Sequence, residues 1–199
     1  EFNNINRAYD SIRKKYDENL LIKWKEGLTG IPLIDACMRC LNQTGYLNFR
    51  MRAMIVSFAA FNLWQNWKNF SHHLAKKFLD YEPGIHYSQI QMQSAVTGVN
   101  TVRIYNPIKN SIDLDPKGEF IKKWLPEVNN IPSEYVHQPW KMTIIEQQMY
   151  NFKIGVDYPS PIVDVNLSRK EAMNKIWEIK KTTKSKTFAK KILNKHVNS

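Results

Sequence analysis

The sequence predicts an all-α fold for this chain of 199 residues. Apolar side chains recur three and four residues apart through most of its length, which is the spacing of one face of a helix. Alternation typical of a strand is confined to residues 99–102. Glycine and proline separate the periodic segments, where helices are expected to end and begin. We therefore expect a multi-helical domain without an internal repeat.

The composition is that of a globular protein with a basic end. Apolar residues make up 43% of the chain, which is enough for one domain with a core. The formal net charge is +11, but seven of the positive charges are lysines within the acid-free residues 180–199. We predict a main domain over residues 1–165, followed by a C-terminal helix and basic tail over residues 166–199. The tail is compatible with nucleic-acid binding and equally with a solvated, disordered end.

No segment of the sequence has the length expected of a membrane span. The longest apolar run, residues 53–61, is shorter than the roughly 20 residues needed to cross a bilayer, and Ser57 interrupts it. No charged start followed by an apolar core indicates secretion. These observations predict an intracellular, cytoplasmic protein without a membrane partner. Because the first residue is Glu1, we expect a fragment or a processed product.

The first part of the chain is predicted to form four helices. Residues 5–25 carry the pattern of one amphipathic helix with a break near Asn19, and residues 32–44 follow with a clean apolar stripe. Residues 48–68 are apolar on every side in the middle, so we expect a buried central helix with Trp64 and Trp67 on one face. Residues 70–78 continue with a helical stripe.

An acidic loop follows these helices. Asp80 and Glu82 come directly before Pro83 and Gly84, which predict a turn. Residues 85–96 are expected to be helical because they lack turn residues. Binding groups tend to gather on such loops, which makes the two carboxylates candidates for a site.

The remainder is predicted to be less regular. Residues 97–117 contain repeated turn signals, and short helices are expected over residues 119–125 and near residues 143–152. Ser168 followed by Glu171 has the pattern of a capping box that begins the last helix.

Metal and nucleophile chemistry have little support in the sequence. Cys37 and Cys40 form a CxxC pair without a second pair elsewhere, so we expect two buried structural thiols. His72 and His73 have no acidic neighbours that would complete a metal site. Phosphate loops, nucleophile elbows and zinc-protease motifs are absent from the sequence. No metal site and no catalytic side chain are predicted.

Two arginines begin the predicted central helix. Arg50 and Arg52 point roughly 200° apart on a helix, so only one of them can face inward. Arg52 shares its face with Val56 and is expected to be buried, where an unpaired guanidinium is very costly. Asp80 or Glu82 would be its partner. The pair is either a structural bridge between helices or one element of a ligand site.

Several ordered motifs lie between residues 24 and 127. They are GLTGIPLIDACMR at 27–39, TGY at 44–46, RMR at 50–52, LD at 79–80, RIYNP at 103–107 and FIKKWLPE at 120–127. Together these motifs resemble the C-terminal FAD-binding helical domain of the DNA photolyase and cryptochrome family. The resemblance implies an all-α domain that is incomplete at its N-terminal side, with FAD as cofactor.

The resemblance also implies roles for individual residues. Arg52 and Asp80 match the pair that lies beside the isoalloxazine ring, and His86 falls at the position that faces flavin N5. The full set of implied cofactor contacts is Asn48, Phe49, Arg52, Asp80, Tyr81, Glu82 and His86. Trp67 matches the middle member of the electron-relay tryptophans, and Arg50 and Arg103 match residues near DNA.

Four residues depart from the family pattern. Phe49 stands where family members often have histidine or asparagine, and His86 stands where photolyases usually carry asparagine. Ile90 replaces the relay tryptophan nearest the flavin, and Met92 replaces a tryptophan that stacks on substrate. We expect photoreduction to be impaired or rerouted and dimer stacking to be weakened.

Three functions remain open on these grounds. The leading hypothesis is a photolyase-like flavoprotein, a deoxyribodipyrimidine photo-lyase that repairs pyrimidine dimers by light-driven electron transfer from reduced flavin. The second is a cryptochrome-like blue-light or redox sensor without repair activity. The third is a flavin-free helical remnant that binds nucleic acid or a partner protein. The full-length protein is expected to bind DNA and to use an N-terminal antenna domain or a separate chain; the chain alone is expected to be inactive.

Overall fold

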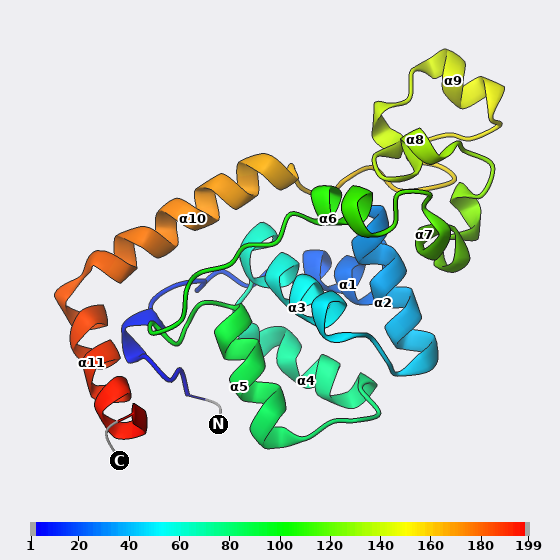
Figure 1. Cartoon of the computed structure of the whole chain (residues 1–199). Helices are drawn as coiled ribbons and strands as arrows, with labels where there is room; N and C mark the ends of the chain where they lie inside the picture. The colour runs from blue at the N-terminus through cyan, green and yellow to red at the C-terminus, as the bar shows by residue number, and fades with distance from the viewer. Residues whose placement is uncertain (1–2, 198–199) are drawn as a thin grey trace.

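The computed structural model describes residues 3–197, and within them it contains helices and no β-strand. The α-helices are α1 (Glu18–Glu26), α2 (Pro32–Thr44), α3 (Phe49–Ser57), α4 (Trp67–Lys77), α5 (Pro83–Gln93), α6 (Pro107–Leu114), α7 (Glu119–Trp124), α8 (Ser133–Val136), α9 (Ile144–Met149), α10 (Val165–Lys181) and α11 (Thr183–Val197). Short 3-10 segments and one π-helical segment, Phe58–Asn62, supplement them. The predicted all-α class is confirmed (Figure 1). No helix in residues 3–197 is both long and apolar enough to cross a membrane.

Helix α2 lies at the centre of the core and packs against α1, α3 and α7. Pro32 occupies its first turn, where a missing N–H costs nothing, as the sequence predicts. Ile34, Cys37 and Leu41 are fully buried on its inner face. Cys37 and Cys40 are buried free thiols, so the structural interpretation of the pair is confirmed.

The predicted helix over residues 48–68 is wrong as one element. Helix α3 ends at Ser57, and the π-helical segment that follows widens the turn, with Leu63 N donating to the Phe58 carbonyl. The chain then reverses at Trp64, whose φ is +52°, before α4 begins at Trp67. Trp64 and Trp67 therefore do not share a helix face. Burial of this segment in the core is confirmed.

Helices α4 and α5 pack against each other and are joined by the acidic loop at 78–82. Phe70, Leu74 and Phe78 are buried in one stripe, as predicted. Pro83 does not form a turn; it is the first residue of α5, and the Glu82 side chain caps that helix by accepting from Ile85 N at 2.7 Å.

Other predicted elements differ in their bounds. Residues 5–17 contain only the 3-10 segment Arg7–Tyr9, so the predicted helix over residues 5–25 is reduced to α1. The stretch 97–117 contains α6, which starts at the Pro107 that follows the N-cap Asn106. The short helix expected over residues 119–125 is confirmed as α7.

The predicted capping box at Ser168 is also wrong. Helix α10 starts earlier, at Val165, because Asp164 caps it by accepting from two backbone N–H groups. Among the residues that the structure describes, a capping box is formed by Thr143 and Glu146 at the start of α9. Both positions carry the same Ser/Thr-x-x-Glu pattern, so the pattern alone does not fix a helix start.

The basic end is helical through α11 and is held to the rest of the domain. Asn6 Nδ2 donates to the Ser185 carbonyl at 3.2 Å, and Ser185 is buried. The Asn62 side chain, from the π-helical segment, donates to Ser168 Oγ of α10 at 2.9 Å. Figure 1 shows α10 and α11 along one edge of the molecule, while α7, α8 and α9 lie at the other. Residues 183–197 therefore form a helix and not the disordered end that the sequence left open.

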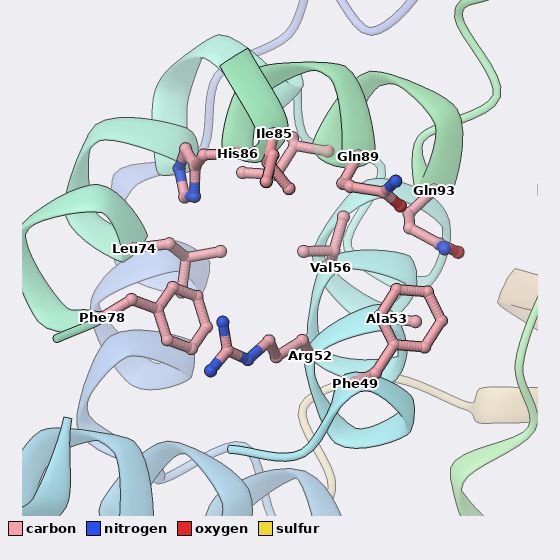
Figure 2. Close-up of a pocket in the computed structure, with 11 residues that line it drawn as sticks. Phe49, Arg52, Ala53, Val56, Leu74, Phe78, Ile85, His86, Gln89 and Gln93 are labelled. Carbon is pink, nitrogen blue, oxygen red and sulfur yellow. The ribbon is translucent and has the colours of Figure 1, made fainter. Parts of the chain in front are cut away.

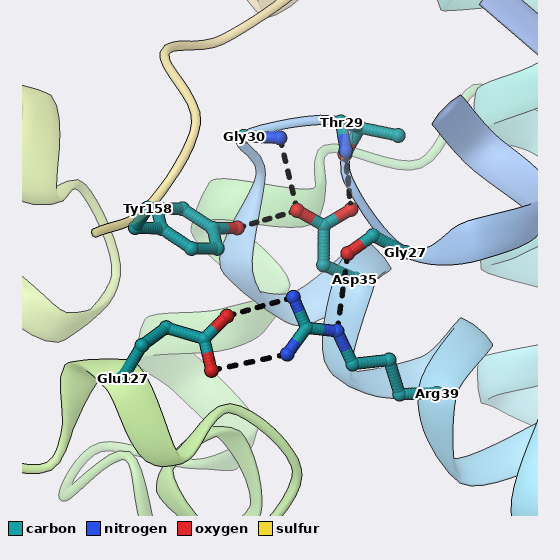
Figure 3. Close-up of polar contacts among 7 residues, drawn as sticks. All are labelled: Gly27, Thr29, Gly30, Asp35, Arg39, Glu127 and Tyr158. Carbon is teal, nitrogen blue, oxygen red and sulfur yellow. Dashed lines mark hydrogen bonds and ion pairs between the residues drawn. The ribbon is translucent and has the colours of Figure 1, made fainter. Parts of the chain in front are cut away.

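A buried carboxylate on α2 joins the turn that precedes the helix to Tyr158, which is distant in sequence (Figure 3). Asp35 on α2 accepts from Thr29 N and Thr29 Oγ1 at 2.8 and 2.6 Å, from Gly30 N at 2.9 Å, and from the Tyr158 hydroxyl. Beside it, Arg39 forms an ion pair with Glu127 at 2.7 Å. Burial raises the pKa of Asp35 to about 6 despite these donors. The network fixes the loop after α9 against the start of α2.

Candidate functional site

A pocket opens between α3, α4 and α5, and we call it the ring pocket (Figure 2). Its cavity volume is about 170 Å³. It is lined by Phe49, Arg52, Ala53, Val56, Leu74, Phe78, Ile85, His86, Gln89, Ile90 and Gln93. Aliphatic and aromatic side chains form most of this lining, and Arg52 supplies its charge. A site of this kind suits a flat, largely apolar ligand that carries a few polar atoms.

The predicted pair of Arg52 and Asp80 is present, with Nη2 and Oδ2 at 2.9 Å. Arg52 is further positioned by its Nε, which donates to the Leu47 carbonyl at 2.6 Å, and its guanidinium carbon lies 4.3 Å from the ring centre of Phe78. The hydrogen bond from Arg52 lowers the pKa of Asp80.

The expected burial of this pair is wrong. The Asp80 side chain is 57% exposed and that of Arg52 is 25% exposed, because Asp80 lies on the loop beyond α4 rather than on the packed face of a helix. An exposed pair of this kind contributes little to folding, roughly 0–1 kcal/mol. The contribution of the Arg52–Asp80 pair to folding stability is therefore too small to explain the pair as a structural bridge between helices.

His86 faces the ring pocket from the first turns of α5. Its Nε2 lies 2.9 Å from the Ser71 carbonyl, and because a carbonyl can only accept, Nε2 carries the hydrogen. Neutral His86 thus has an unprotonated Nδ1 that can accept a hydrogen bond. Burial lowers the pKa of His86, so the neutral form is favoured at neutral pH. The Tyr81 ring packs edge-on against His86, with ring centres 5.2 Å apart.

Gln89 was not singled out from the sequence, and it lies one helical turn after His86. Its Oε1 atom is buried and has no hydrogen-bond partner among the residues that the structure describes. In Figure 2, Gln89 and Phe49 lie across the hollow from His86 and Phe78. A buried acceptor without a donor is unusual in a protein, so Oε1 is free to accept a hydrogen bond from a ligand or from water. The one sequence signal that could have identified Gln89 as a pocket residue is its position three residues after His86, which places both on one side of a helix.

The other predicted cofactor residues lie around the ring pocket rather than in its lining. Glu82 is engaged as the cap of α5, and Asn48 caps α3 by accepting from Met51 N at 3.0 Å. Asn48 lines a separate hollow together with Arg50. Their contact with a cofactor stays a prediction.

Two further hollows continue from the ring pocket. The middle hollow, of about 300 Å³, shares Phe49 and Gln93 with the ring pocket and also contains Met92 and Arg103. The arginine hollow, of about 450 Å³, shares Arg103 with the middle hollow. It is lined by Arg50, Val102, Arg103, Ile104, Tyr105, Asn110, Arg169 and Met173. The two arginines predicted to contact DNA therefore lie in one hollow, on the side of α3 away from Arg52.

Trp67 is buried behind the ring pocket and does not line it. Its indole Nε1 donates to Asn4 Oδ1 at 2.6 Å. Its ring centre lies 6.4 Å from that of Tyr87, which in turn lies 5.1 Å from that of His86. Ile90, in contrast, lines the ring pocket as an aliphatic wall. Aromatic rings thus connect Trp67 to the pocket through Tyr87.

Comparison with known proteins assigns the chain to a family. Residues 1–178 match the family model for the FAD binding domain of DNA photolyase. A deoxyribodipyrimidine photo-lyase of Alkalihalophilus pseudofirmus is 35% identical over 173 residues, which cover 85% of this chain and 36% of that protein. A cryptochrome DASH of Gloeobacter violaceus is 35% identical over 159 residues, covering 78% of this chain and 32% of that protein.

A solved structure shares the fold over most of the chain. It is a bacterial class III photolyase from Agrobacterium tumefaciens, with a TM-score of 0.84 and 27% identity over 91% of this chain and 38% of that one. The fold and the family match thus define a helical FAD-binding domain. The chain belongs to the family of FAD-binding domains of DNA photolyases, whose relatives include both photolyases and cryptochromes. It spans about a third of the length of the curated relatives it matches.

Proposed function

We propose that the ring pocket holds the isoalloxazine end of FAD. The observation that carries this proposal is the unpartnered Oε1 of Gln89 in an apolar pocket that also contains the Arg52 guanidinium. The isoalloxazine ring is flat and largely apolar, and it carries N–H and C=O groups at its edge that would complement these atoms. A volume of about 170 Å³ is below the roughly 300–1,000 Å³ of a complete small-molecule site, which suits one end of a larger cofactor.

The side chains around the ring would orient it and exclude water. Val56, Leu74 and Ile90 provide the apolar walls, and Arg52, held by Asp80, places a fixed positive charge at the edge. His86 offers Nδ1 as an acceptor. When bound and reduced, FAD would supply, on excitation by light, the electron that splits a pyrimidine dimer and is then returned. No nucleophilic side chain is required for that chemistry.

For the whole protein we propose light-driven repair of pyrimidine dimers in DNA. Arg50 and Arg103 would contact the phosphate backbone beside the middle hollow, through which a flipped-out base could approach the ring pocket. Trp67 would serve electron transfer through Tyr87.

A sensor function is the second candidate. Met92 lines the middle hollow where a tryptophan would stack on the substrate, and Ile90 interrupts the usual relay. Both features favour a cryptochrome-like protein that binds FAD without repair. Restoration of dimer-containing DNA by illumination of the reduced full-length protein supports repair, and bound FAD without restoration supports the sensor.

The flavin proposal is tested by the variant Asp80→Asn. Loss of the carboxylate releases Arg52, whose charge then no longer lies fixed at the ring edge. We expect FAD affinity, measured by quenching of flavin fluorescence, to weaken by at least about fivefold. Asp113→Asn, an exposed change on α6, is the matched control and should bind FAD like the unmodified chain. Equal FAD affinity in Asp80→Asn and the control would contradict the assignment.

A further inference from the structure

One face of α10 continues outward from the arginine hollow. Arg169, Met173, Trp177 and Lys180 follow one another at intervals of four, four and three residues, so they lie in one stripe along the helix. We call these four residues the α10 track. From Arg169 to Lys180 the stripe is about 16 Å long.

The inner end of the α10 track is built into a basic hollow. Arg169 and Met173 line the arginine hollow together with Arg50 and Arg103, so three segments distant in sequence bring three arginines together. Among the described residues, none of these three arginines forms an ion pair with a carboxylate. Their charge is therefore available to an anionic partner.

The outer end of the track carries an aromatic platform. Trp177 is 46% exposed, although tryptophan is among the side chains that gain most from burial. The Lys180 ammonium lies 5.3 Å from its ring centre. An exposed ring beside a cation is the arrangement that proteins use to stack a nucleobase and neutralise the neighbouring phosphate.

Acidic residues lie away from this face. On a helical wheel Glu171 and Glu178 of α10 fall roughly 100° or more from Trp177, on the other side of the helix. Beyond Glu178 the sequence contains no Asp or Glu, and the exposed lysines of α11 add positive charge. Lys175 marks the opposite flank, where its ammonium lies 4.9 Å from the Trp64 ring centre.

We propose that the α10 track binds single-stranded nucleic acid, with the backbone on Arg169 and Lys180 and a base stacked on Trp177. A stripe of about 16 Å accommodates about five stacked nucleotides. The strand would run outward from the arginine hollow toward α11. This surface extends the DNA contacts proposed for Arg50 and Arg103 and in that respect rests on the proposed function, but it needs neither the ring pocket nor FAD.

The test is fluorescence anisotropy with the 199-residue chain and a labelled oligothymidylate of about 12 nucleotides. Trp177→Ala is expected to weaken binding about 5-fold to 100-fold, and Trp177→Phe to retain most of the affinity. Arg169→Gln should reduce the slope of log K against log salt by about 0.7, the value for one phosphate contact on a single strand. Lys175→Gln, which removes the same charge from the opposite flank, should change neither quantity.

Other outcomes would overturn the proposal. They are equal affinity in Trp177→Ala and the unmodified chain, equal losses in Arg169→Gln and Lys175→Gln, and binding to phosphatidylglycerol vesicles without binding to the oligonucleotide. Circular dichroism of each variant excludes unfolding as the cause. Because no flavin is present in the assay, failure of FAD binding and failure of the α10 track are observed separately.

Discussion

The contact between Tyr158 and Asp35 gives the sharpest prediction of stability. Tyr158→Phe removes one hydroxyl donor from a buried carboxylate and leaves the volume of the side chain nearly unchanged. A hydrogen bond to a charged group contributes about 1.5–3 kcal/mol. In the variant, Asp35 Oδ2 still accepts a hydrogen bond from Gly30 N at 2.9 Å, so this oxygen keeps one donor. The loss in the free energy of unfolding should therefore be near 2 kcal/mol. That corresponds to a fall in Tm of about 4–8 °C for a domain of this size.

The stability lost in Tyr158→Phe should also depend on pH. The pKa of Asp35 is about 6 in the fold and about 3.9 in an unfolded chain. Because the folded protein binds the proton more tightly, this carboxyl stabilises folding in acid, and its contribution falls as pH rises from about 4 to about 6. Tyr158 holds the pKa of Asp35 down through its hydrogen bond. In Tyr158→Phe the pKa therefore rises further, and the decline continues above pH 6.

Urea unfolding of Tyr158→Phe at two pH values measures both effects. We expect the variant to lose more stability at about pH 7 than at about pH 5, where Asp35 is mostly protonated in either protein. Tyr16→Phe, a change at an exposed ring, is the control and should unfold like the unmodified chain. An equal loss at both pH values would refute the assigned role of the Asp35 carboxylate.

Three further changes should alter stability, each measured by denaturant unfolding. Gly30→Ala should cost about 2–4 kcal/mol, since the φ of Gly30 is +76° and an added Cβ would lie 2.4 Å from the Ser160 carbonyl oxygen; a neutral result would contradict this packing. Thr143→Ala should cost about 1 kcal/mol by removing the capping box with Glu146, and no change would place the start of α9 elsewhere. Ile34→Ala should cost about 2–5 kcal/mol, and a loss below 1 kcal/mol, as at an exposed position, would argue against α2 as the core helix.

The sequence predicts the helical class and the pairing in the site better than it predicts the helix bounds. Arg52 and Asp80 meet as expected, although the pair is partly exposed and not buried as the sequence predicted. The exposure of Asp80 could not be predicted, since the geometry of its loop is set by how α4 and α5 pack. The start of α6 could have been predicted from the sequence, because Asn106 followed by Pro107 is also the pattern of an N-cap and a first helical turn.

The break after α3 has no comparable signal. The π-helical segment Phe58–Asn62 contains neither glycine nor proline, and Trp64 adopts a positive φ without a turn residue beside it. Packing of this segment against α10 decides its shape, and that contact joins residues more than a hundred positions apart. Gln89 was missed for the same reason, because only the assembled pocket reveals that its Oε1 is buried without a donor.

The central claim is that the ring pocket recognises an isoalloxazine ring, and a titration with lumiflavin tests it most directly. Lumiflavin carries the ring without the ribityl and adenine parts, so it reports on α3, α4 and α5 alone. We predict saturable quenching of lumiflavin fluorescence that FAD competes away and that Gln89→Leu weakens. A chain that gives no saturable quenching, or that binds lumiflavin equally well after Gln89→Leu and Asp80→Asn, would contradict it.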